Sequence, residues 1–491
     1  MSSSVSRRRL LTGAAGAAGL LLIGGCSRDP GAAVAPGSDA VRRAEGARTT
    51  PGGRLVSAKL TARPVALDLG GPIVGTWAYG DRVPGPVLRA RAGDRLRVDL
   101  VNQLPAETTV HWHGVALRND MDGVPGMTQD AIASGGSFRY EFVVRDPGTY
   151  FYHPHVGVQL DRGLYGVLIV DDPDEPGRYD AEWILVLDDW VDGTGRTPDQ
   201  VLESLGGPGL DRNGMGHMAG MERAQSALLG GAGDVTYPHY LANGRVPAAP
   251  VTFTGKPGRR VRLRVVNAGS DTAFRLALER HRMTVTHSDG FPVRPQSADA
   301  VLIAMGERID LELTLGDGVF PLVATAEGKS GLARAIVRTA GGRVPPASQE
   351  PAELERQVVL ASQLRAADAV RLSGKKVDRT LDVVLGGSMM PYRWTINGKT
   401  FPDTEPLGVE QGERVRLRFA NHTMMFHPVH VHGHTFGLAD GGARKDTAVV
   451  RPMEILAVDL DAGNPGQWAT HCHNIYHAER GMMVALSYRQ S

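Results

Sequence analysis

Gly93–Asn102 (GDRLRVDLVN) opens a pattern that the chain repeats twice, as Gly258–Asn267 (GRRVRLRVVN) and Gly412–Asn421 (GERVRLRFAN). The successive copies lie 165 and 154 residues apart. Apolar residues alternate with charged ones in each copy, which is the period of a β-strand with one buried face. An Asn-Gly turn, at Asn243 and at Asn397, precedes the second and third copies by the same 15 residues. Repeats at domain-sized intervals predict three homologous β-sandwiches and an all-β fold.

Length and composition agree with this division. The chain has 491 residues, enough for about three domains, and its 62 glycines and 31 prolines suit a turn-rich all-β protein. We place the domain boundaries in the Asp- and Pro-rich stretch 171–180 and at 341–351 (GGRVPPASQEP). The predicted domains then run over 54–171, 172–345 and 346–491. Within the middle domain, the Gly- and Met-rich stretch 206–234 predicts a long loop.

Charge and cysteine content exclude several classes of protein. Lysine and arginine number 54 against 53 aspartates and glutamates, so nothing favours a nucleic-acid partner or an anionic membrane surface. The sequence has two cysteines, Cys26 and Cys472. This excludes a disulfide framework beyond one conceivable bridge, and it excludes four-cysteine zinc and iron–sulfur sites. The 16 histidines are clustered, which favours a metal enzyme.

The N-terminal segment 1–26 has the features of an export signal. Residues 6–11 (SRRRLL) are of the twin-arginine type, and the uncharged run of 16 residues that follows is shorter than the roughly 20 that span a bilayer. The run ends at 22–26 (LIGGC), which resembles a lipobox. We therefore predict twin-arginine export and lipidation of Cys26, giving a cell-envelope lipoprotein on the extracytoplasmic face; an ordinary cleaved signal or a single-pass anchor is the alternative. The stretch 27–53, rich in Ala, Gly and Pro, is predicted to be a flexible tether, so that only the lipid contacts the membrane.

Four His-x-His pairs carry the metal prediction. They are His111/His113, His153/His155, His430/His432 and His471/His473. On a strand, residues i and i+2 point to the same face about 6.5–7 Å apart, so one pair can bind one metal ion or two adjacent ions. The pairs follow the repeat, because HWHG at 111–114 corresponds to HVHG at 430–433, whereas the middle copy has no such pair. We therefore predict eight imidazoles, four each from the first and third domains, at the interface between them.

A second metal site is predicted beside the first. Cys472 lies between His471 and His473, so strand alternation turns its sulfur to the opposite face. Its expected partners are His427, His477 and Met482. Two imidazoles, a thiolate and a thioether suit a blue copper, whereas zinc prefers a closed tetrahedral set; core packing is the alternative role of the methionine. The flanking histidines give an electron taken up at Cys472 a short covalent route to the cluster, where several coppers together can reduce dioxygen fully.

The motifs HWHG, HPH, HPVHVHGH and HCHNIYHAERGMM resemble the four copper signatures of the multicopper oxidases, a family that includes laccases, ferroxidases and copper-resistance oxidases. The resemblance spans about residues 54–491 and implies three cupredoxin-like Greek-key β-sandwich domains with four copper ions per chain. Its motif positions imply a type 1 copper in the third domain, held by His427, Cys472, His477 and Met482. They also imply a type 2 copper held by His111 and His430, and a type 3 pair held by His113, His153, His155, His432, His471 and His473.

Three acidic positions bear on proton supply and on the blue site. Asp122 matches an acid that the family places near the trinuclear cluster, where a carboxylate relays protons; an ordinary turn residue is the alternative. The copper-efflux oxidases carry a second acid directly after the position of His477, whereas this chain has Ala478 there and Glu479 one step further. Asp446 is similar to a family residue near the blue site.

The sequence leaves the reductant open. The same oxidases place an acid and a methionine before His427 to bind cuprous ion, and here those positions hold Thr423 and Met425, with Met424 between them. Thioethers suit the soft Cu(I) ion. Further candidate contacts in the 206–234 loop are Met215, Met218 and Met221. A loop that happens to contain methionines is the alternative for these three.

The leading hypothesis is an oxidase that couples one-electron oxidation of Cu(I), Fe(II), Mn(II) or a phenolic compound to four-electron reduction of dioxygen to water, in copper detoxification. We expect a monomer whose partners are dioxygen and the reductant. A copper-binding or structural envelope protein that keeps the scaffold without turnover is a different class, but such members have lost ligands that this chain retains. Copper nitrite reductase is a third possibility, and its two-domain layout differs from three repeats.

Overall fold

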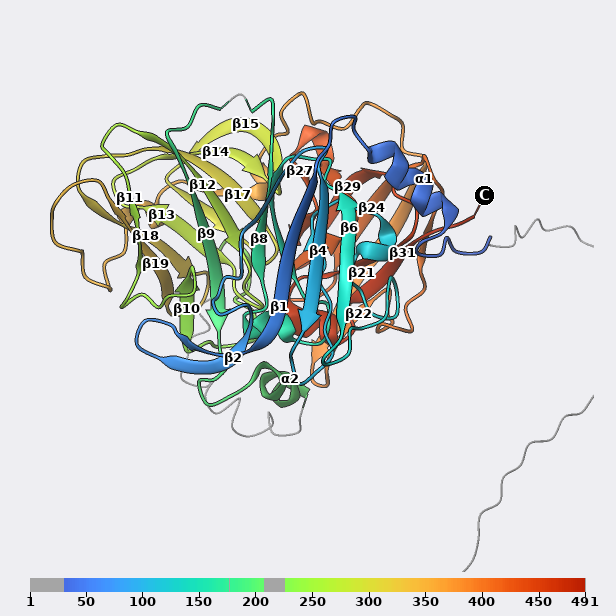
Figure 1. Cartoon of the computed structure of the whole chain (residues 1–491), viewed down its shortest axis with the longest axis horizontal. Helices are drawn as coiled ribbons and strands as arrows, with labels where there is room; N and C mark the ends of the chain where they lie inside the picture. The colour runs from blue at the N-terminus through green and yellow to red at the C-terminus, as the bar shows by residue number, and fades with distance from the viewer. Residues whose placement is uncertain (1–30, 176, 207–225, 491) are drawn as a thin grey trace, which may run out of the picture.

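The first repeated stretch forms β4 (Arg95–Asn102), a strand in the first of three β-sandwiches. The computed structural model describes residues 31–175, 177–206 and 226–490 of the chain (Figure 1). The other strands of the first sandwich are β1 (Leu55–Asp68), β2 (Ile73–Tyr79), β3 (Leu88–Arg91), β5 (His111–His113), β6 (Ser137–Val143), β7 (Gly148–His153) and β8 (Gly166–Asp171). They form two four-stranded sheets in the orders β2-β1-β4-β6 and β3-β8-β7-β5.

The second stretch forms β12 (Arg260–Asn267) of the middle sandwich. Its other strands are β9 (Ala181–Trp190), β10 (His239–Ala242), β11 (Val251–Thr254), β13 (Phe274–Leu278), β14 (Met283–Ser288), β15 (Phe291–Ala298), β16 (Ala300–Ile303), β17 (Arg308–Thr314), β18 (Val319–Ala326), β19 (Leu332–Arg338) and β20 (Val358–Leu360). Two six-stranded sheets result, β10-β9-β12-β17-β14-β15 and β11-β19-β18-β13-β16-β20. Because β20 pairs with β16, the middle sandwich extends to Leu360, past the boundary that we place at 345 from the sequence.

The third stretch forms β24 (Arg414–Asn421) of the third sandwich. Its other strands are β21 (Arg379–Met389), β22 (Tyr392–Ile396), β23 (Leu407–Val409), β25 (His427–Val431), β26 (Phe436–Leu438), β27 (Arg444–Lys445), β28 (Thr447–Val450), β29 (Ile455–Asp461), β30 (Gln467–Cys472) and β31 (Met483–Tyr488). The sheets are β22-β21-β24-β29-β26-β27 and β23-β31-β30-β25-β28. The α-helices within residues 31–175, 177–206 and 226–490 are α1 (Asp39–Arg48), α2 (Pro198–Gly206) and α4 (Ile475–Glu479). Among the described residues, no helix has the length and apolar character needed to cross a membrane.

The strands β4, β12 and β24 occupy the same position in their sheets. Each pairs in parallel with an earlier strand (β1, β9 or β21) and antiparallel with a later one (β6, β17 or β29). The asparagines that close them, Asn102, Asn267 and Asn421, are buried and donate from their side-chain amides to backbone carbonyls of the following turns. Asn243 and Asn397 adopt the positive φ angles, 49° and 52°, that an Asn-Gly turn requires. The three-sandwich, all-β prediction is confirmed.

The N-terminal segment differs from its prediction. We expect a flexible tether over 27–53, but the part that the structure describes, from residue 31, is folded. Val34 donates its backbone N–H to the carbonyl of Tyr488 at the end of β31. The following helix α1 packs on the first sandwich, where its buried Glu45 accepts a 2.7 Å hydrogen bond from the backbone N–H of Val143. The segment therefore links the third sandwich to the first, as its place beside the C-terminus shows (Figure 1).

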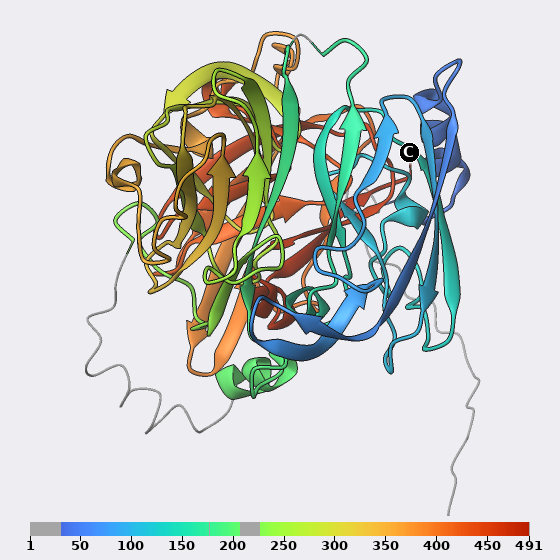
Figure 2. The ribbon, with the colours of Figure 1, turned by 60° about the vertical axis from the view of Figure 1, so that its left-hand side comes forward.

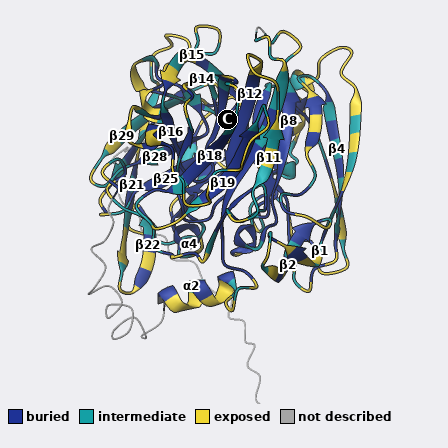
Figure 3. Ribbon diagram, turned by 90° about the vertical axis from the view of Figure 1, so that its left-hand side faces the viewer, coloured by how far each residue is buried: buried dark blue, intermediate teal, exposed yellow. Residues whose placement is uncertain are grey.

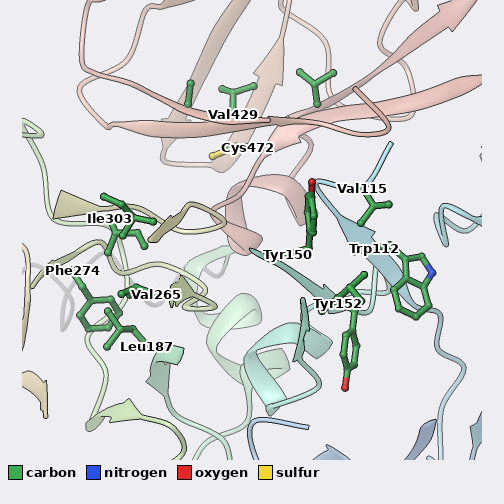
Figure 4. Close-up of a cluster of buried hydrophobic side chains, with 14 of the residues drawn as sticks. Trp112, Val115, Tyr150, Tyr152, Leu187, Val265, Phe274, Ile303, Val429 and Cys472 are labelled. Carbon is green, nitrogen blue, oxygen red and sulfur yellow. The ribbon is translucent and has the colours of Figure 1, made fainter. Parts of the chain in front are cut away.

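The three sandwiches share one hydrophobic core. Two views place the orange-to-red third sandwich against both of the others (Figures 1 and 2), and the buried strand faces point inward while the outer loops are exposed (Figure 3). A single contiguous cluster includes Trp112 of the first domain, Phe274 of the middle domain and Val429 of the third (Figure 4). Cys472 belongs to the same cluster, so the predicted blue site is buried in the core.

Candidate metal centre

The eight paired histidines come from two equivalent places in the first and third sandwiches. The first four lie on β5, on β7 and just past the end of β7, and the register of these strands places His111 opposite His153. The other four lie at and just past the ends of β25 and β30, with His430 opposite His471. The two sets meet face to face across the domain interface, because the His111 ring stacks on that of His432 with centroids 3.7 Å apart.

The imidazoles gather in three groups, two of which share His113, and the nitrogen atoms within each group lie within 4.8 Å of one another. The groups are His113/His153/His473, His155/His432/His471 and His111/His113/His430. The first two groups together hold the predicted type 3 set, and the third holds the predicted type 2 pair. In the second group, His471 Nε2 lies 3.3 Å from His155 Nε2 and 2.9 Å from His432 Nε2. Three ring nitrogens thus converge on one point.

Hydrogen bonds fix which nitrogen faces the centre in several of the rings. His111 Nδ1 lies 3.0 Å from the carbonyl of Asp122, and His153 Nδ1 lies 2.8 Å from that of Pro154. Each of these nitrogens must therefore carry the ring proton, which leaves the lone pair on Nε2 free. Within the described part of the chain, the buried ring nitrogens that have no hydrogen-bond partner are His111 Nε2, His113 Nδ1, His153 Nε2, His430 Nε2 and both nitrogens of His473.

These orphaned nitrogens fit metal ions. A buried polar atom without a partner costs about 1–3 kcal/mol, so a cluster of such atoms is unfavourable unless a ligand satisfies them. Burial, reinforced by the neighbouring imidazoles, lowers the pKa of His113, His153, His155, His432 and His473 well below the usual value. The rings are therefore neutral, the form that binds copper.

The predicted blue site is assembled on the other face of β30. Cys472 Sγ lies 3.6 Å from both His427 Nδ1 and His477 Nδ1, and the two nitrogens are 3.1 Å apart. Burial raises the pKa of the Cys472 thiol, so it needs a cation to ionise. Met482 is fully buried, and its carbonyl accepts a hydrogen bond from the Cys472 backbone N–H. Figure 4 shows the Cys472 sulfur in the shared core, and the chemistry of the set fits one copper.

Asp234 is a residue of this site that the sequence does not reveal. Its Oδ2 accepts hydrogen bonds from His477 Nε2 at 2.8 Å and from the Tyr392 hydroxyl at 2.7 Å. Burial opposes its charge, but the hydrogen bond from His477 lowers the pKa of the carboxyl below its usual value. Asp271 holds the Asp234 backbone N–H in place. Because 243 residues separate Asp234 from His477, no local motif identifies it.

The acids near the eight histidines differ in their contacts. Asp122 is fully buried, and its Oδ2 lies 2.9 Å from His432 Nδ1. Glu479 lines a pocket together with His155, His471 and His473. Burial raises the pKa of the Glu479 carboxyl to about 6.

Asp446 lies elsewhere than the sequence suggests. It is similar to a family residue near the blue site, but in this fold its Oδ1 is 3.1 Å from His113 Nε2. Its backbone carbonyl lies 2.9 Å from His430 Nδ1. The expectation is therefore wrong: Asp446 belongs to the eight-histidine centre, because the turn between β27 and β28 faces the first domain.

Of the methionines predicted to contact Cu(I), the structure describes Met424 and Met425. Met424 is 73% exposed and Met425 is half-buried. Thr423, at the position that holds the expected acid of the copper-efflux oxidases, has its Oγ1 2.8 Å from His427 Nε2. The remaining candidates lie outside the described residues: Met215, Met218, Met221 and the lipidation site Cys26.

Comparisons with known proteins agree with this geometry. Three family models, each described as multicopper oxidase, match residues 65–175, 181–342 and 377–491. The multicopper oxidase MmcO of Mycobacterium tuberculosis is 50% identical, over 98% of this chain and 96% of its own length. A copper resistance protein A homolog of Pseudomonas syringae pv. tomato is 29% identical, over 82% of this chain and 87% of its own length.

Solved structures that superpose on this chain are also multicopper oxidases. A multi-copper oxidase of Pseudomonas thermotolerans superposes with a TM-score of 0.68 at 28% identity, covering 88% of this chain and 99% of that chain. Fet3p superposes with a TM-score of 0.77 at 21% identity, covering 88% and 90%, which is a likeness of fold. The chain therefore belongs to the multicopper oxidase family, and it is a copper-dependent oxidoreductase.

Proposed function

We propose that the chain holds four coppers and couples one-electron oxidation of cuprous ion to four-electron reduction of dioxygen to water. The observation that carries this proposal is the set of orphaned imidazole nitrogens facing one another across the domain interface, next to a buried cysteine with two histidines. His427, Cys472, His477 and Met482 would hold the type 1 ion. His111 and His430 would hold the type 2 ion, and His113, His153, His155, His432, His471 and His473 the type 3 pair.

Cys472 and its neighbours supply the electron route. When bound, copper supplies reversible one-electron oxidation and the binding of dioxygen. His471 and His473 are joined to Cys472 by the backbone at the end of β30, and the His471 Nδ1 also lies 2.9 Å from the Cys472 carbonyl. The path from Cys472 to either histidine therefore runs through covalent bonds of the backbone, with one hydrogen bond as a shorter connection to His471.

Asp122 is placed to handle protons. Full reduction of one dioxygen consumes four electrons and four protons and releases two waters, so the centre needs a proton supply within a water-poor interface. Asp122 contacts His432 with Oδ2, and its Oδ1 lies 3.2 Å from His111 Nδ1, so this carboxylate touches a ring from each domain. We assign it to holding these rings and passing protons inward.

The reductant is proposed from the surface beside His427. Met424, three residues before His427 in the sequence, is an exposed methionine, and soft thioether sulfur favours Cu(I) over Fe(II) or Mn(II). Relatives named for copper resistance support a role in copper detoxification. Phenols remain alternative donors in the test below.

Export and assembly complete the proposal. The arginine-rich start and the cysteine at position 26 support export by the twin-arginine route as a lipid-anchored envelope protein. The eight histidines of one chain suffice to form the centre, so the site requires no second subunit, and we propose a monomer.

Copper content and turnover together test this function. The copper-loaded full chain should bind four copper ions, show the blue band, and consume dioxygen with Cu(I). Cys472→Ser should lose the blue band and Cu(I) oxidation while it keeps the trinuclear coppers. A loaded parent chain without trinuclear copper, or one inert toward Cu(I), Fe(II) and a phenol, would overturn the proposal. Activity with the phenol alone would overturn only the Cu(I) assignment.

A further inference from the structure

The middle sandwich has none of the eight histidines, yet one of its arginines enters their centre. Arg308, the first residue of β17, is fully buried. Its Nη1 donates to Asp446 Oδ1 at 2.8 Å and its Nη2 donates to Asp446 Oδ2 at 2.6 Å. Such a two-point contact fixes both the position and the plane of the carboxylate.

The fixed carboxylate reaches an imidazole of the first domain. His113 Nε2 lies 3.1 Å from Asp446 Oδ1 and 3.0 Å from Thr447 Oγ1. Because an ionised carboxylate only accepts hydrogen bonds, Nε2 must carry the ring proton, and the orphaned Nδ1 faces the centre. His113 thus presents the ring nitrogen opposite to the one that His111 and His153 present, and Asp446 is what selects it.

The same residue orients an imidazole of the third domain. The Asp446 carbonyl lies 2.9 Å from His430 Nδ1, and its Oδ1 lies 3.3 Å from that nitrogen. The His430 ring is stacked on the His113 ring with centroids 3.7 Å apart. One aspartate therefore sets the ring orientation of both histidines, one from the proposed type 2 pair and one from the proposed type 3 set.

The surroundings are shaped to keep the ion pair in place. A Cβ on Gly114 of the HWHG motif would lie 2.3 Å from Arg308 Nη2 and 2.5 Å from Asp446 Oδ2, so the first domain leaves room for the pair only by using glycine there. Arg308 Nε donates to the carbonyl of Thr149, and Asp289 of the middle domain accepts from the Arg308 backbone N–H. All three domains contact this pair.

We propose that Arg308 and Asp446 form a positioning pair through which the copper-free middle domain fixes His113 and His430 and so sets the copper affinity of the trinuclear centre. The inference rests on the proposed copper sites. The partners that orient metal-binding histidines are typically worth 10- to 100-fold in metal affinity, so loss of either member should weaken the trinuclear coppers by about that factor. The type 1 site, which neither residue contacts among the described residues, should keep its affinity.

Chelator competition on the copper-loaded full chain tests the pair. The variants are Arg308→Met, Asp446→Asn and Arg308→Lys, and the readouts are copper retained per chain, the type 2 electron paramagnetic resonance signal and the blue band. Arg275→Met is the matched control, because Arg275 makes a two-point contact to Glu327 in the same sandwich, with both hydrogen bonds at 2.8 Å, and neither residue contacts the eight histidines among the described residues.

In Arg308→Met and Asp446→Asn, we expect the type 2 signal and the trinuclear copper to be lost at a chelator concentration 10- to 100-fold lower than the parent chain requires. The blue band should be unchanged. Arg308→Lys, which keeps the charge but not the two-point geometry, should be intermediate, and it remains informative if the methionine variant fails to fold. Retention equal to the parent in folded Asp446→Asn and Arg308→Lys would overturn the inference. Equal loss in Arg275→Met would do the same, because it would reveal general destabilisation. A parent that binds no trinuclear copper would instead refute the proposed function.

Discussion

Asp234 provides a sharp test of the blue site, because it holds His477 and Tyr392 at once. Asp234→Ala removes the acceptor for two buried donors, His477 Nε2 at 2.8 Å and the Tyr392 hydroxyl at 2.7 Å. A buried donor left without a partner costs about 1–3 kcal/mol, so the variant should lose about 2–6 kcal/mol of local stability. Tyr392→Phe removes a single hydrogen bond and should cost about 1 kcal/mol, and Asp234→Asn, which keeps an acceptor oxygen, should cost a similar amount.

The assay is the urea concentration at which the copper-loaded chain loses its blue absorption, converted to free energy with the measured slope. The expected order of stability is the parent, then Tyr392→Phe and Asp234→Asn together, then Asp234→Ala. The reasoning fails if Asp234→Ala stays within about 0.5 kcal/mol of the parent, since a buried donor pair cannot lose its acceptor at so small a cost. It also fails if Tyr392→Phe is the more damaging change.

The same variants separate charged from neutral donors. A unit charge acting over about 10 Å at an effective dielectric constant of about 20 contributes about 1.7 kcal/mol. Asp234→Asn should therefore lower kcat/KM for a cationic donor such as Cu(I) by about tenfold to twentyfold, while kcat/KM for a neutral phenol changes much less. Equal losses for both donors would show that Asp234 acts only by orienting His477.

Three further predictions follow from individual contacts. Met424→Leu removes the exposed thioether without changing much volume, so KM for Cu(I) should rise several-fold while KM for a phenol stays constant; parallel changes would exclude a direct role in Cu(I) binding. Glu45→Ala deletes the acceptor of the Val143 backbone N–H, and urea unfolding should show a loss of about 1–3 kcal/mol, whereas an unchanged midpoint would mean that α1 is not anchored in solution. Cys472→Ser should retain the fold, as measured by circular dichroism, but lose the blue band, and a variant that stays blue would place type 1 copper elsewhere.

The fold could be predicted from the sequence because its signal is local and repeated. Alternation along Gly93–Asn102 reports one buried strand face, and two further copies at domain-sized spacing report the number of sandwiches. The paired histidines are predictable for the same reason, since residues i and i+2 on one strand share a face. Their meeting across the interface follows from the equivalence of the first and third copies.

What the sequence could not show depends on contacts between distant segments. Asp234 reaches His477, and Arg308 reaches Asp446 across 138 residues, without any spacing rule to relate them. The N-terminal segment was expected to be a tether because its composition is that of a linker, yet a few anchoring contacts such as that of Glu45 order it. The contact of Asp446 with His113 is hidden from the sequence for a similar reason, since the two residues come from different domains.

The stoichiometry of oxygen consumption tests the central claim most directly. The copper-loaded full chain is supplied with a limiting amount of Cu(I), and dioxygen uptake and hydrogen peroxide are measured together. If the eight histidines bind a cluster that collects electrons through Cys472, one dioxygen disappears for every four Cu(I) oxidised and no peroxide accumulates. One dioxygen consumed for every two Cu(I), with release of peroxide, would contradict the account, because it would show that the electrons never assemble at a trinuclear centre.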